Sequence, residues 1–528
     1  MNRPLISRWL PLAVLAFAPL AHAQLLTDTQ PKTVQSVLES VNRYCSGCHK
    51  VPSPSVMPKS GWPRVVQGMA DMAASKAGHE AIPADVLRDI TALYVGSSPA
   101  SLPRLPYFTR EGSPLTFGMT ELGEKSAVPL ILNINATPLH DDTTPGFIIC
   151  DGAGKKVVLL QKKGRAWHET ALADIDIPLH TDVADIDGDG YKDIIVADLG
   201  TFPPSPALTG KVVLLRQLPS GKFEKQVLLD KVGRVTDARA MDIDNDGDLD
   251  IGVAIFGGGD VGELAWLENL GDGKLGGGKF VPHRILKVTG ALNLSPVDLD
   301  NDGKIDFVSL IAQQHEAVVA FMNKGQGSFA YTALYRGPHP MFGSTSMKVI
   351  DMDGDQDPDI LFTNGDALDY QPDPKPYHGV EWLENKGNLT FEFRDIGRFY
   401  GTAIADAGDL DGDGDMDVVA GSWLNYWDDP QRQSLVWFEN DGAQNFTPHA
   451  IISRPAGVVS LALADVNHDQ RPDIVAGIFE LDLLGEFVKN DGVDQGAQDM
   501  AQNTAKPAKS ALKPRLILLQ GELAKPAH

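Results

Sequence analysis

The sequence predicts a multidomain protein in which a small all-α domain precedes an all-β, seven-bladed β-propeller. Three observations lead to this fold class. The chain has 528 residues, more than one compact core usually holds. Apolar residues recur at helical spacing up to about residue 104, and the remainder repeats one acidic motif at intervals of 53 to 58 residues.

The composition is that of a folded, acidic protein. Hydrophobic residues make up 43% and charged residues 22%, and 52 Gly with 36 Pro are too few for a low-complexity chain. The 46 basic residues against 70 acidic ones give a net charge of −24, which repels nucleic acid and anionic membrane surfaces. We therefore expect no nucleic-acid partner.

The first 23 residues read as a cleavable signal peptide. Arg3 and Arg8 precede an apolar run over residues 9–21, and Ala21-His22-Ala23 offers small residues where a signal peptidase cuts. We expect cleavage after Ala23 and a periplasmic or secreted protein. The apolar run is shorter than a bilayer span and no later segment is long enough, so no membrane span is expected.

Residues 24–104 are expected to fold as a small helical domain with one covalent cofactor. Apolar periodicity predicts helices near residues 34–44, 62–69 and 83–96. The first helix runs into Cys45-Ser46-Gly47-Cys48-His49. Two cysteines three residues apart can add to the vinyl groups of a haem, and the adjacent His49 can bind its iron. A dithiol redox pair and half of a zinc site are the alternatives, but neither a thioredoxin-like context nor further ligands are evident.

The sixth iron ligand is less determined than the fifth. Met69 shares a predicted helix face with Trp62 and Val65, which favours it as the ligand. Met72 and Met57 are alternatives, as is an open or histidine-ligated site.

This segment resembles a class I cytochrome c domain of the kind fused to repeat propellers in exported bacterial proteins. The resemblance rests on C-S-G-C-H, the P-S-P stretch, G-W-P-R-V-V-Q-G-M and D-I-T-A-L-Y. It implies haem c as the cofactor.

Residues 105–528 carry the repeats, with six acidic loops of the form D-x-D-x-D-G-x-x-D. Alternating carboxylates around a tight turn provide the hard oxygen ligands that Ca²⁺ prefers. The expected ligands are Asp185, Asp187, Asp189 and Asp193; Asp242, Asp244, Asp246 and Asp250; Asp298, Asp300, Asp302 and Asp306; Asp351, Asp353, Asp355 and Asp359; Asp409, Asp411, Asp413 and Asp417; and Asp465, Asn467, Asp469 and Asp473.

Not all copies are equal. Gln356 and Gln470 replace the turn glycine, and Asn467 replaces an aspartate, so the fourth and sixth loops are weaker candidates for calcium. A degenerate seventh copy near residues 133–135 lacks the carboxylates and should bind none. The loops resemble the FG-GAP or VCBS-type repeats of integrin α-chain propellers, and we expect the calcium to be structural.

Each repeat reads as a four-stranded blade. A W-x-E-N-like signature marks the third strand, and an aromatic residue opens the fourth. Residues 515–520 match the third strand of the last blade, and nothing after them supplies a fourth. Residues 114–119 could supply it and close the ring between the two ends of the domain.

The loops opposite the calcium turns hold a second set of candidates, for recognition rather than for metal. Single histidines there are more often solvated than functional, and Trp423 and Trp427 could simply cover a blade. Cys150 is expected in the core. The set is His180, Asp237, Arg239, Asn293, His315, Glu316, His339, Asp366, Tyr370, His378 and Ser422-Trp423-Leu424-Asn425-Tyr426-Trp427.

Together these features predict an exported c-type cytochrome that carries out haem-based electron transfer, with the propeller as a binding or docking platform. The redox partner, a protein or a small molecule, is not identified by the sequence. One alternative is a dehydrogenase that oxidises a small substrate at the channel mouth and passes electrons to the haem. Another is an adhesion or glycan-binding module.

Overall fold

The computed structural model describes residues 33–47, 49–75, 82–139, 146–202, 205–257, 261–271, 279–366, 374–480 and 511–524. The expected signal peptide, Cys48 and Tyr370 lie outside these ranges. No helix within them is long and apolar enough to cross a membrane.

Three α-helices and one 3-10 turn form the N-terminal unit. They are α1 (Val34–Cys45), η1 (Pro54–Val56), α2 (Trp62–Ser75) and α3 (Ala84–Ser97). Thr33 caps α1, since its hydroxyl accepts a hydrogen bond from the Ser36 amide at 3.2 Å. All three helices contribute to one small core, in which the rings of Trp62 and Tyr94 lie 4.3 Å apart.

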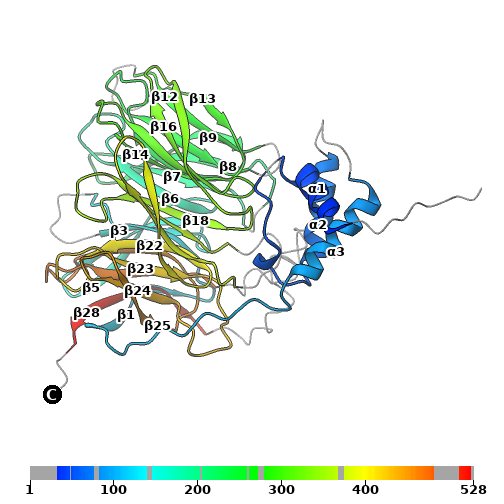
Figure 1. Cartoon of the computed structure of the whole chain (residues 1–528). Coiled ribbons are helices and arrows are strands. Elements are labelled where there is room, and N and C mark those ends of the chain that lie inside the picture. Colours follow the sequence, from blue (N-terminus) through cyan, green and yellow to red (C-terminus); the bar gives the residue numbers. More distant parts are fainter. Residues whose placement is uncertain are drawn as a thin grey trace, which may run out of the picture.

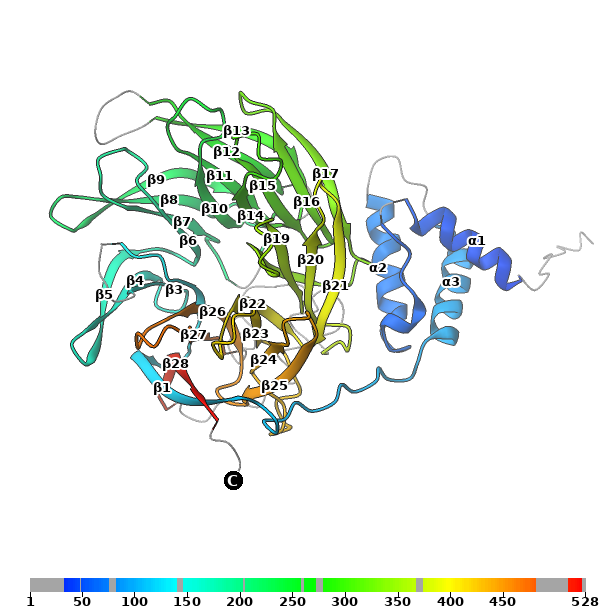
Figure 2. The same cartoon turned by 60° about the vertical axis from the view of Figure 1, so that its left-hand side comes forward.

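The rest of the described chain forms seven four-stranded antiparallel sheets, which confirms the predicted seven-bladed β-propeller (Figures 1 and 2). From the ring centre outward, blades 1 to 3 are β2 (Ile131–Asn135), β3 (Gly146–Asp151), β4 (Lys156–Lys163), β5 (Ala166–Asp174); β6 (Pro178–Ala184), β7 (Asp193–Asp198), β8 (Gly210–Gln217), β9 (Phe223–Val232); and β10 (Val235–Met241), β11 (Asp250–Ile255), β12 (Glu263–Asn269), β13 (Phe280–Lys287).

Blades 4 to 7 complete the ring. They are β14 (Ala291–Val297), β15 (Asp306–Ile311), β16 (Ala317–Asn323), β17 (Phe329–Arg336); β18 (Ser344–Ile350), β19 (Asp359–Asn364), β20 (Gly379–Asn385), β21 (Phe391–Arg398); β22 (Thr402–Gly408), β23 (Asp417–Ser422), β24 (Leu435–Asn440), β25 (Phe446–Ile452); and β26 (Val458–Ala464), β27 (Asp473–Ile478), β28 (Lys513–Leu523), β1 (Leu115–Ser126).

The second strand of every blade is buried along its length, because it lies between two strands of its own sheet and between two neighbouring blades. After the aspartate that begins them in blades 2 to 7, these strands consist mostly of apolar or small residues, as doubly covered strands do. Cys150 in β3 is fully buried, as expected for a core residue.

The last blade takes its outer strand from the other end of the domain. β1 pairs with β28 antiparallel, from Leu115 opposite Leu523 to Leu122 opposite Leu516. The expected closing residues 114–119 thus lie mainly within β1, and residues 515–520 lie within β28. This pairing gives both strands a hydrogen-bonded neighbour and leaves no open gap in the ring.

Polar side chains bridge the innermost strands. Asn135 donates to the Thr181 carbonyl at 2.7 Å, and Asn293 donates to the Met347 carbonyl at 3.1 Å. Ser460 closes the circle, donating to the Ile131 carbonyl at 2.9 Å. Since the named sheets do not pair with one another, these contacts supply polar links between adjacent blades.

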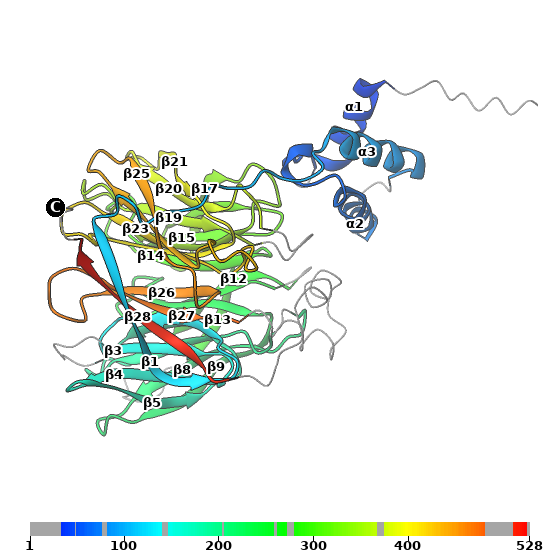
Figure 3. The ribbon, with the colours of Figure 1, turned by 90° about the horizontal axis from the view of Figure 1, so that it is seen from below.

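The helical unit lies on one side of the ring (Figures 1 and 3). The chain after α3 is bound to the propeller before it reaches β1. Residues 104–110, which we call the strap, run along blade 6 before reaching β1 (Figure 2). Phe108 packs edge-on against Phe399 and Phe438, and the Thr109 carbonyl accepts the Ala450 amide at 2.9 Å.

Candidate functional site

The first candidate site is where α1 ends, at the C-x-x-C-H motif. Cys45 is the last residue of α1 and is half-buried against the helical core. Burial raises the pKa of its thiol. Cys45 is not in a disulfide. Its partner in the motif, Cys48, lies outside the described residues.

His49 is oriented by its own neighbour. Its Nδ1 lies 2.8 Å from the Lys50 carbonyl, so the ring donates there and Nε2 is the nitrogen left for a ligand. Histidines that bind metals commonly donate their other ring nitrogen to a carbonyl in this way.

The chain after His49 is held against the helices by three hydrogen bonds. The Tyr94 hydroxyl donates to the Pro52 carbonyl at 3.0 Å, whereas Trp62 Nε1 and the Ser98 hydroxyl both donate to the Pro54 carbonyl, at 3.1 and 2.7 Å. The aromatic residues quoted in the sequence motifs therefore fix the segment that carries His49.

The candidate methionines differ in placement. Met57 is 1% exposed and Met69 is half-buried, and both belong to the cluster that contains Cys45. Met72 is 48% exposed on α2 and lies outside that cluster. The structure thus brings together Cys45, Met57 and Met69 in one cluster, and Met72 is not part of it.

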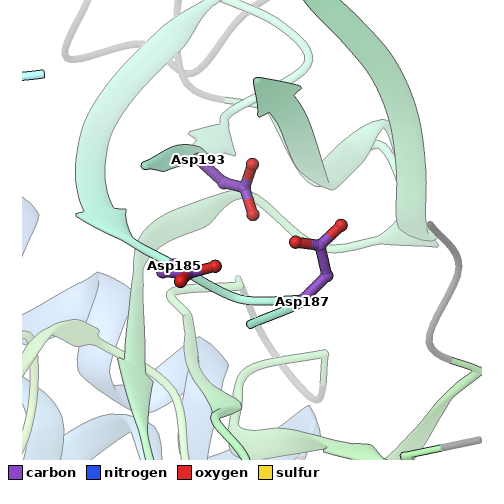
Figure 4. A group of neighbouring side chains, drawn as sticks. All are labelled: Asp185, Asp187 and Asp193. Atoms are coloured by element: carbon purple, nitrogen blue, oxygen red, sulfur yellow. The ribbon is translucent and has the colours of Figure 1, made fainter. Parts of the chain in front are cut away.

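The second candidate site is the set of acidic loops between the first and second strands of blades 2 to 7. In five of them, three carboxylates each offer an oxygen within 4.8 Å of the others. Figure 4 shows one such group, with the carboxylates turned toward one another. The groups are Asp185, Asp187 and Asp193; Asp242, Asp244 and Asp246; Asp298, Asp300 and Asp302; Asp351, Asp353 and Asp355; and Asp409, Asp411 and Asp417.

The first aspartate organises every loop. In the loop of blade 2, Asp185 accepts the amides of Asp189 at 3.0 Å and Gly190 at 2.9 Å. Gly190 is the sixth residue of its loop. In the other five loops, too, the amide of the sixth residue donates to the first aspartate, at 2.9 to 3.2 Å. The turn is therefore preformed by backbone amides, and other carboxylates remain directed into the loop.

The sixth position requires a left-handed backbone. Gly247 has φ +97°, and Gln356 adopts the same region at φ +72°. The fourth loop therefore keeps its turn and its carboxylate group without the glycine. The cost is the backbone strain of a residue with a side chain in the left-handed region.

The sixth loop is different. Asn467 donates to Asp469, and Arg471 pairs with the same carboxylate at 3.0 Å. Within the described residues, this loop contains no group of three close carboxylates. The degenerate loop of blade 1 lies partly outside the described residues.

The last aspartate of each loop has a structural role that the sequence motif did not reveal. Asp250 begins β11 and is fully buried, and its two oxygens accept the amides of Asn269 at 2.8 Å and Ile243 at 3.0 Å. Burial raises its pKa to about 7. Asp193, Asp306, Asp359 and Asp417 make the equivalent pair of bonds.

The asparagine of the W-x-E-N signature completes this arrangement. Asn269 donates its side-chain amide to the Leu249 carbonyl at 3.2 Å, directly before Asp250. Asn385 and Asn440 repeat the contact at 3.1 and 3.2 Å. The signature therefore ties the third strand to the acidic loop, which explains why the two features recur together.

The residues expected on the opposite face form separate groups. His180 Nδ1 lies 2.8 Å from Asp237, whose carboxylate also binds Arg239 Nε at 3.0 Å and the Leu294 amide at 3.1 Å. These partners hold the pKa of Asp237 at about 2 against the opposing effect of burial. Asn293 donates to the Met347 carbonyl of β18, the innermost strand of the next blade.

His339 and His378 form a second group, around Tyr377. The Tyr377 ring lies 5.0 Å from His339 and 5.3 Å from His378. His339 Nδ1 and His378 Nε2 are buried and have no hydrogen-bond partner within the described ranges. Burial lowers the pKa of His339 to about 4.

The remaining candidates are mainly structural. Glu316 Oε2 accepts the amide and hydroxyl of Ser344 at 2.9 and 2.7 Å. Trp423 donates to the Gly365 carbonyl at 2.8 Å and packs in a cluster with Phe479, so it covers the blades. His315 approaches Gln314 at 3.2 Å, and Asp366 donates its amide to the Gly343 carbonyl at 3.0 Å.

Comparison with known proteins concerns the repeats. The FG-GAP-like repeat model matches residues 185–253, 242–309, 298–362 and 423–476. The first three matches each begin at the first aspartate of an acidic loop. No curated protein matches the chain. The chain therefore contains FG-GAP-like repeats, and they form part of a seven-bladed β-propeller.

Proposed function

We propose that the protein is a c-type cytochrome that transfers single electrons through a covalently bound haem, with the propeller as a binding or docking platform. The observation that carries this proposal is the C-x-x-C-H motif at the end of α1, where Cys45 borders the helical core and His49 directs Nδ1 to a carbonyl. Two cysteines and an adjacent histidine are the groups that bind haem c, and the bond at Nδ1 leaves His49 Nε2 for the iron, which supports the proposal.

The residues have distinct roles in this proposal. Cys45 and Cys48 form the thioether links, and His49 Nε2 is the fifth ligand. Met69 is the preferred sixth ligand and Met57 the alternative, because both share the core with Cys45. The haem supplies reversible one-electron chemistry when bound. Trp62, Tyr94 and Val41 are buried in the helical core and would keep water from it when haem is bound.

We further propose that the acidic loops bind structural Ca²⁺. Five groups of three carboxylate oxygens within 4.8 Å support this, since hard oxygen ligands around a turn suit Ca²⁺. The loops at Asp185, Asp242, Asp298, Asp351 and Asp409 are the proposed sites. The proposal also includes removal of residues 1–23 as a signal peptide and export of the protein to an oxidising compartment.

Haem attachment is tested by making the exported protein in a host that attaches haem c, followed by extraction with acidified acetone. The haem should stay on the polypeptide at one per chain. Replacing both Cys45 and Cys48 by Ala should abolish covalent haem, whereas Cys150→Ala should keep it, because Cys150 lies fully buried in β3 far along the chain. Haem that is fully extractable from the unaltered protein would rule out the proposal.

The sixth ligand is tested by the weak near-infrared band of a methionine–ferric iron bond. Met69→Leu should abolish the band, and Met72→Leu is the matched control because Met72 is exposed on the same helix. Loss of the band in Met57→Leu instead would transfer the assignment to Met57.

A second candidate function is suggested by the His180–Asp237–Arg239 group. A histidine fixed by a buried carboxylate on the inner strands would accept one of the two protons that a small substrate releases on oxidation, and the second proton would pass to solvent. The two electrons would pass one at a time through the haem to an external acceptor. Reduction of the haem band by small alcohols, amines or sugars, lost in His180→Gln, would favour this function. Binding of glycans without haem reduction would favour an adhesive role.

A further inference from the structure

The helical core contains one residue that belongs to the propeller. Met341 lies on the loop between β17 and β18 and is 9% exposed. It is part of the same apolar cluster as Met57, Trp62 and Val65, against which Cys45 and Met69 also pack. The core of the helical unit is thus completed by a side chain some 240 residues away from α3.

The loop that presents Met341 is firmly held. The Tyr377 hydroxyl donates to the Met341 carbonyl at 3.0 Å, and the Phe342 amide donates to the His339 carbonyl at 3.1 Å. At its two ends, the Gly337 amide and Ser344 both bind Glu316. A loop fixed by buried hydrogen bonds presents its side chain in one position.

A second contact brings the propeller next to His49. The Lys50 carbonyl accepts a hydrogen bond from His49 Nδ1, and Lys50 Nζ donates to the Arg336 carbonyl at 3.4 Å. Arg336 ends β17, directly before the Met341 loop. The same segment of the propeller therefore borders both the methionine cluster and the residue that orients His49.

The position of this contact within the blade is defined by strand direction. β18 begins at Ser344, next to the Met341 loop, and ends at Ile350, next to the acidic loop of blade 5. The contact with the helical unit therefore lies at the end of the blade opposite the acidic loop. Figures 1 and 3 show the helical unit on one side of the ring.

We infer that the propeller completes the haem site: Met341 forms part of the apolar wall around the cofactor. This inference rests on the proposed function. The propeller is then more than a platform for docking, because it sets how much water reaches the haem. Water stabilises the more highly charged ferric state, so an apolar wall raises the reduction potential.

The test compares Met341→Ala with Met119→Ala in the holoprotein. Met119 is 51% exposed on β1 and serves as the matched control. Met341→Ala should favour the ferric form at least tenfold, which lowers the potential by about 59 mV for one electron. Met341→Leu, which keeps the volume, should restore most of the potential, while Met119→Ala should leave it unchanged.

A second readout does not depend on haem. In a background with both Cys45→Ala and Cys48→Ala, amides of α2 and α3 should exchange hydrogen at least tenfold faster when Met341 is also replaced by Ala. Unchanged potential and unchanged exchange in Met341→Ala would overturn the inference. Absence of covalent haem from the unaltered protein would instead overturn the proposed function, and the exchange comparison would still decide whether Met341 completes the helical core.

Discussion

At the scale of single residues, the aspartates of one acidic loop have two different roles. Asp242, Asp244 and Asp246 present oxygens to one another, whereas Asp250 directs both of its oxygens to backbone amides of β12 and of its own loop. The motif alone makes all four look like equivalent ligands. The difference becomes visible only when the third strand is placed beside the loop.

Replacing these residues should separate the two roles. With a chelator present, Asp250→Ala should lower the free energy of unfolding by about 2 to 4 kcal/mol, because the amides of Asn269 and Ile243 lose their buried acceptor. Asp244→Ala should cost little under chelation, and should reduce calcium content and stability only when calcium is present. Urea unfolding with and without chelator measures both. Equal losses for the two variants under chelation would contradict the assignment.

His339 should make the fold sensitive to acid. Its pKa is lowered to about 4 by burial, against 6.5 in the unfolded chain, so the folded state resists protonation. Its contribution is complete above pH 6.5 and is lost as the pH falls toward 4, by up to about 3 kcal/mol.

Urea unfolding at pH 7.0 and 4.5 measures this contribution. His339→Gln should show a smaller loss of stability between the two values than the unaltered protein, by about 2 to 3 kcal/mol. His378 remains in both proteins and largely cancels from the difference. The same loss in both proteins would show that His339 is protonated without cost in the folded state.

At the scale of elements, the repeated pattern predicted the blades because each one repeats the same local signals. The acidic turn, the apolar second strand and the W-x-E-N signature all lie within one blade. They therefore follow one another at short separations in the sequence. The strap and the Met341 loop carry no such signal. Their contacts join segments more than 200 residues apart, through backbone carbonyls and packing that no short pattern specifies.

Arg432 is the residue that fixes the strap. It is 5% exposed and donates to the carbonyls of Leu105 at 3.0 Å and Pro106 at 3.2 Å. Its guanidinium also lies 4.4 Å from the Tyr107 ring. Charged hydrogen bonds of this kind contribute about 1.5 to 3 kcal/mol.

Arg432→Ala should therefore release the strap. Trypsin should cut after Arg104 or Arg110 at least tenfold faster than in the unaltered protein, as followed by the appearance of a fragment that contains the helical unit. Arg165→Ala, in the exposed turn between β4 and β5, is the matched control. An unchanged cleavage rate in Arg432→Ala would mean that Phe108 and Thr109 hold the strap without the contacts of Arg432.

At the scale of the whole molecule, ring closure could be anticipated because the last repeat lacks a fourth strand. The pairing of β1 with β28 joins residues about 400 positions apart, so closure of the ring depends on contact between the two ends of the domain. The helical unit could be anticipated from its motif and periodicity. Its contact at the end of a blade opposite the acidic loop could not, because it depends on the shape of both folded parts.

The acidic loops concentrate negative charge at one end of the blades. Five loops bring three carboxylates within 4.8 Å of one another, in a chain whose net charge is −24. Such groups repel each other unless a cation lies between them, and a cation that binds only the folded loops stabilises the fold by mass action.

Removing calcium should therefore destabilise the propeller directly, and should affect the helical unit only when the propeller unfolds and Met341 leaves the helical core. Each site contributes about 2.7 kcal/mol at a hundredfold excess of calcium over its dissociation constant, and several sites add when the ring unfolds as one. Chelation should lower the melting temperature of the β-structure by many degrees. At temperatures where the propeller is still folded, the haem spectrum should stay almost unchanged, because the described helices contain no acidic loop. Asp411→Ala should reproduce part of the loss, and Asn133→Ala should leave calcium content unchanged. Identical melting curves before and after confirmed metal removal would reduce the acidic loops to tight turns held by their first and last aspartates.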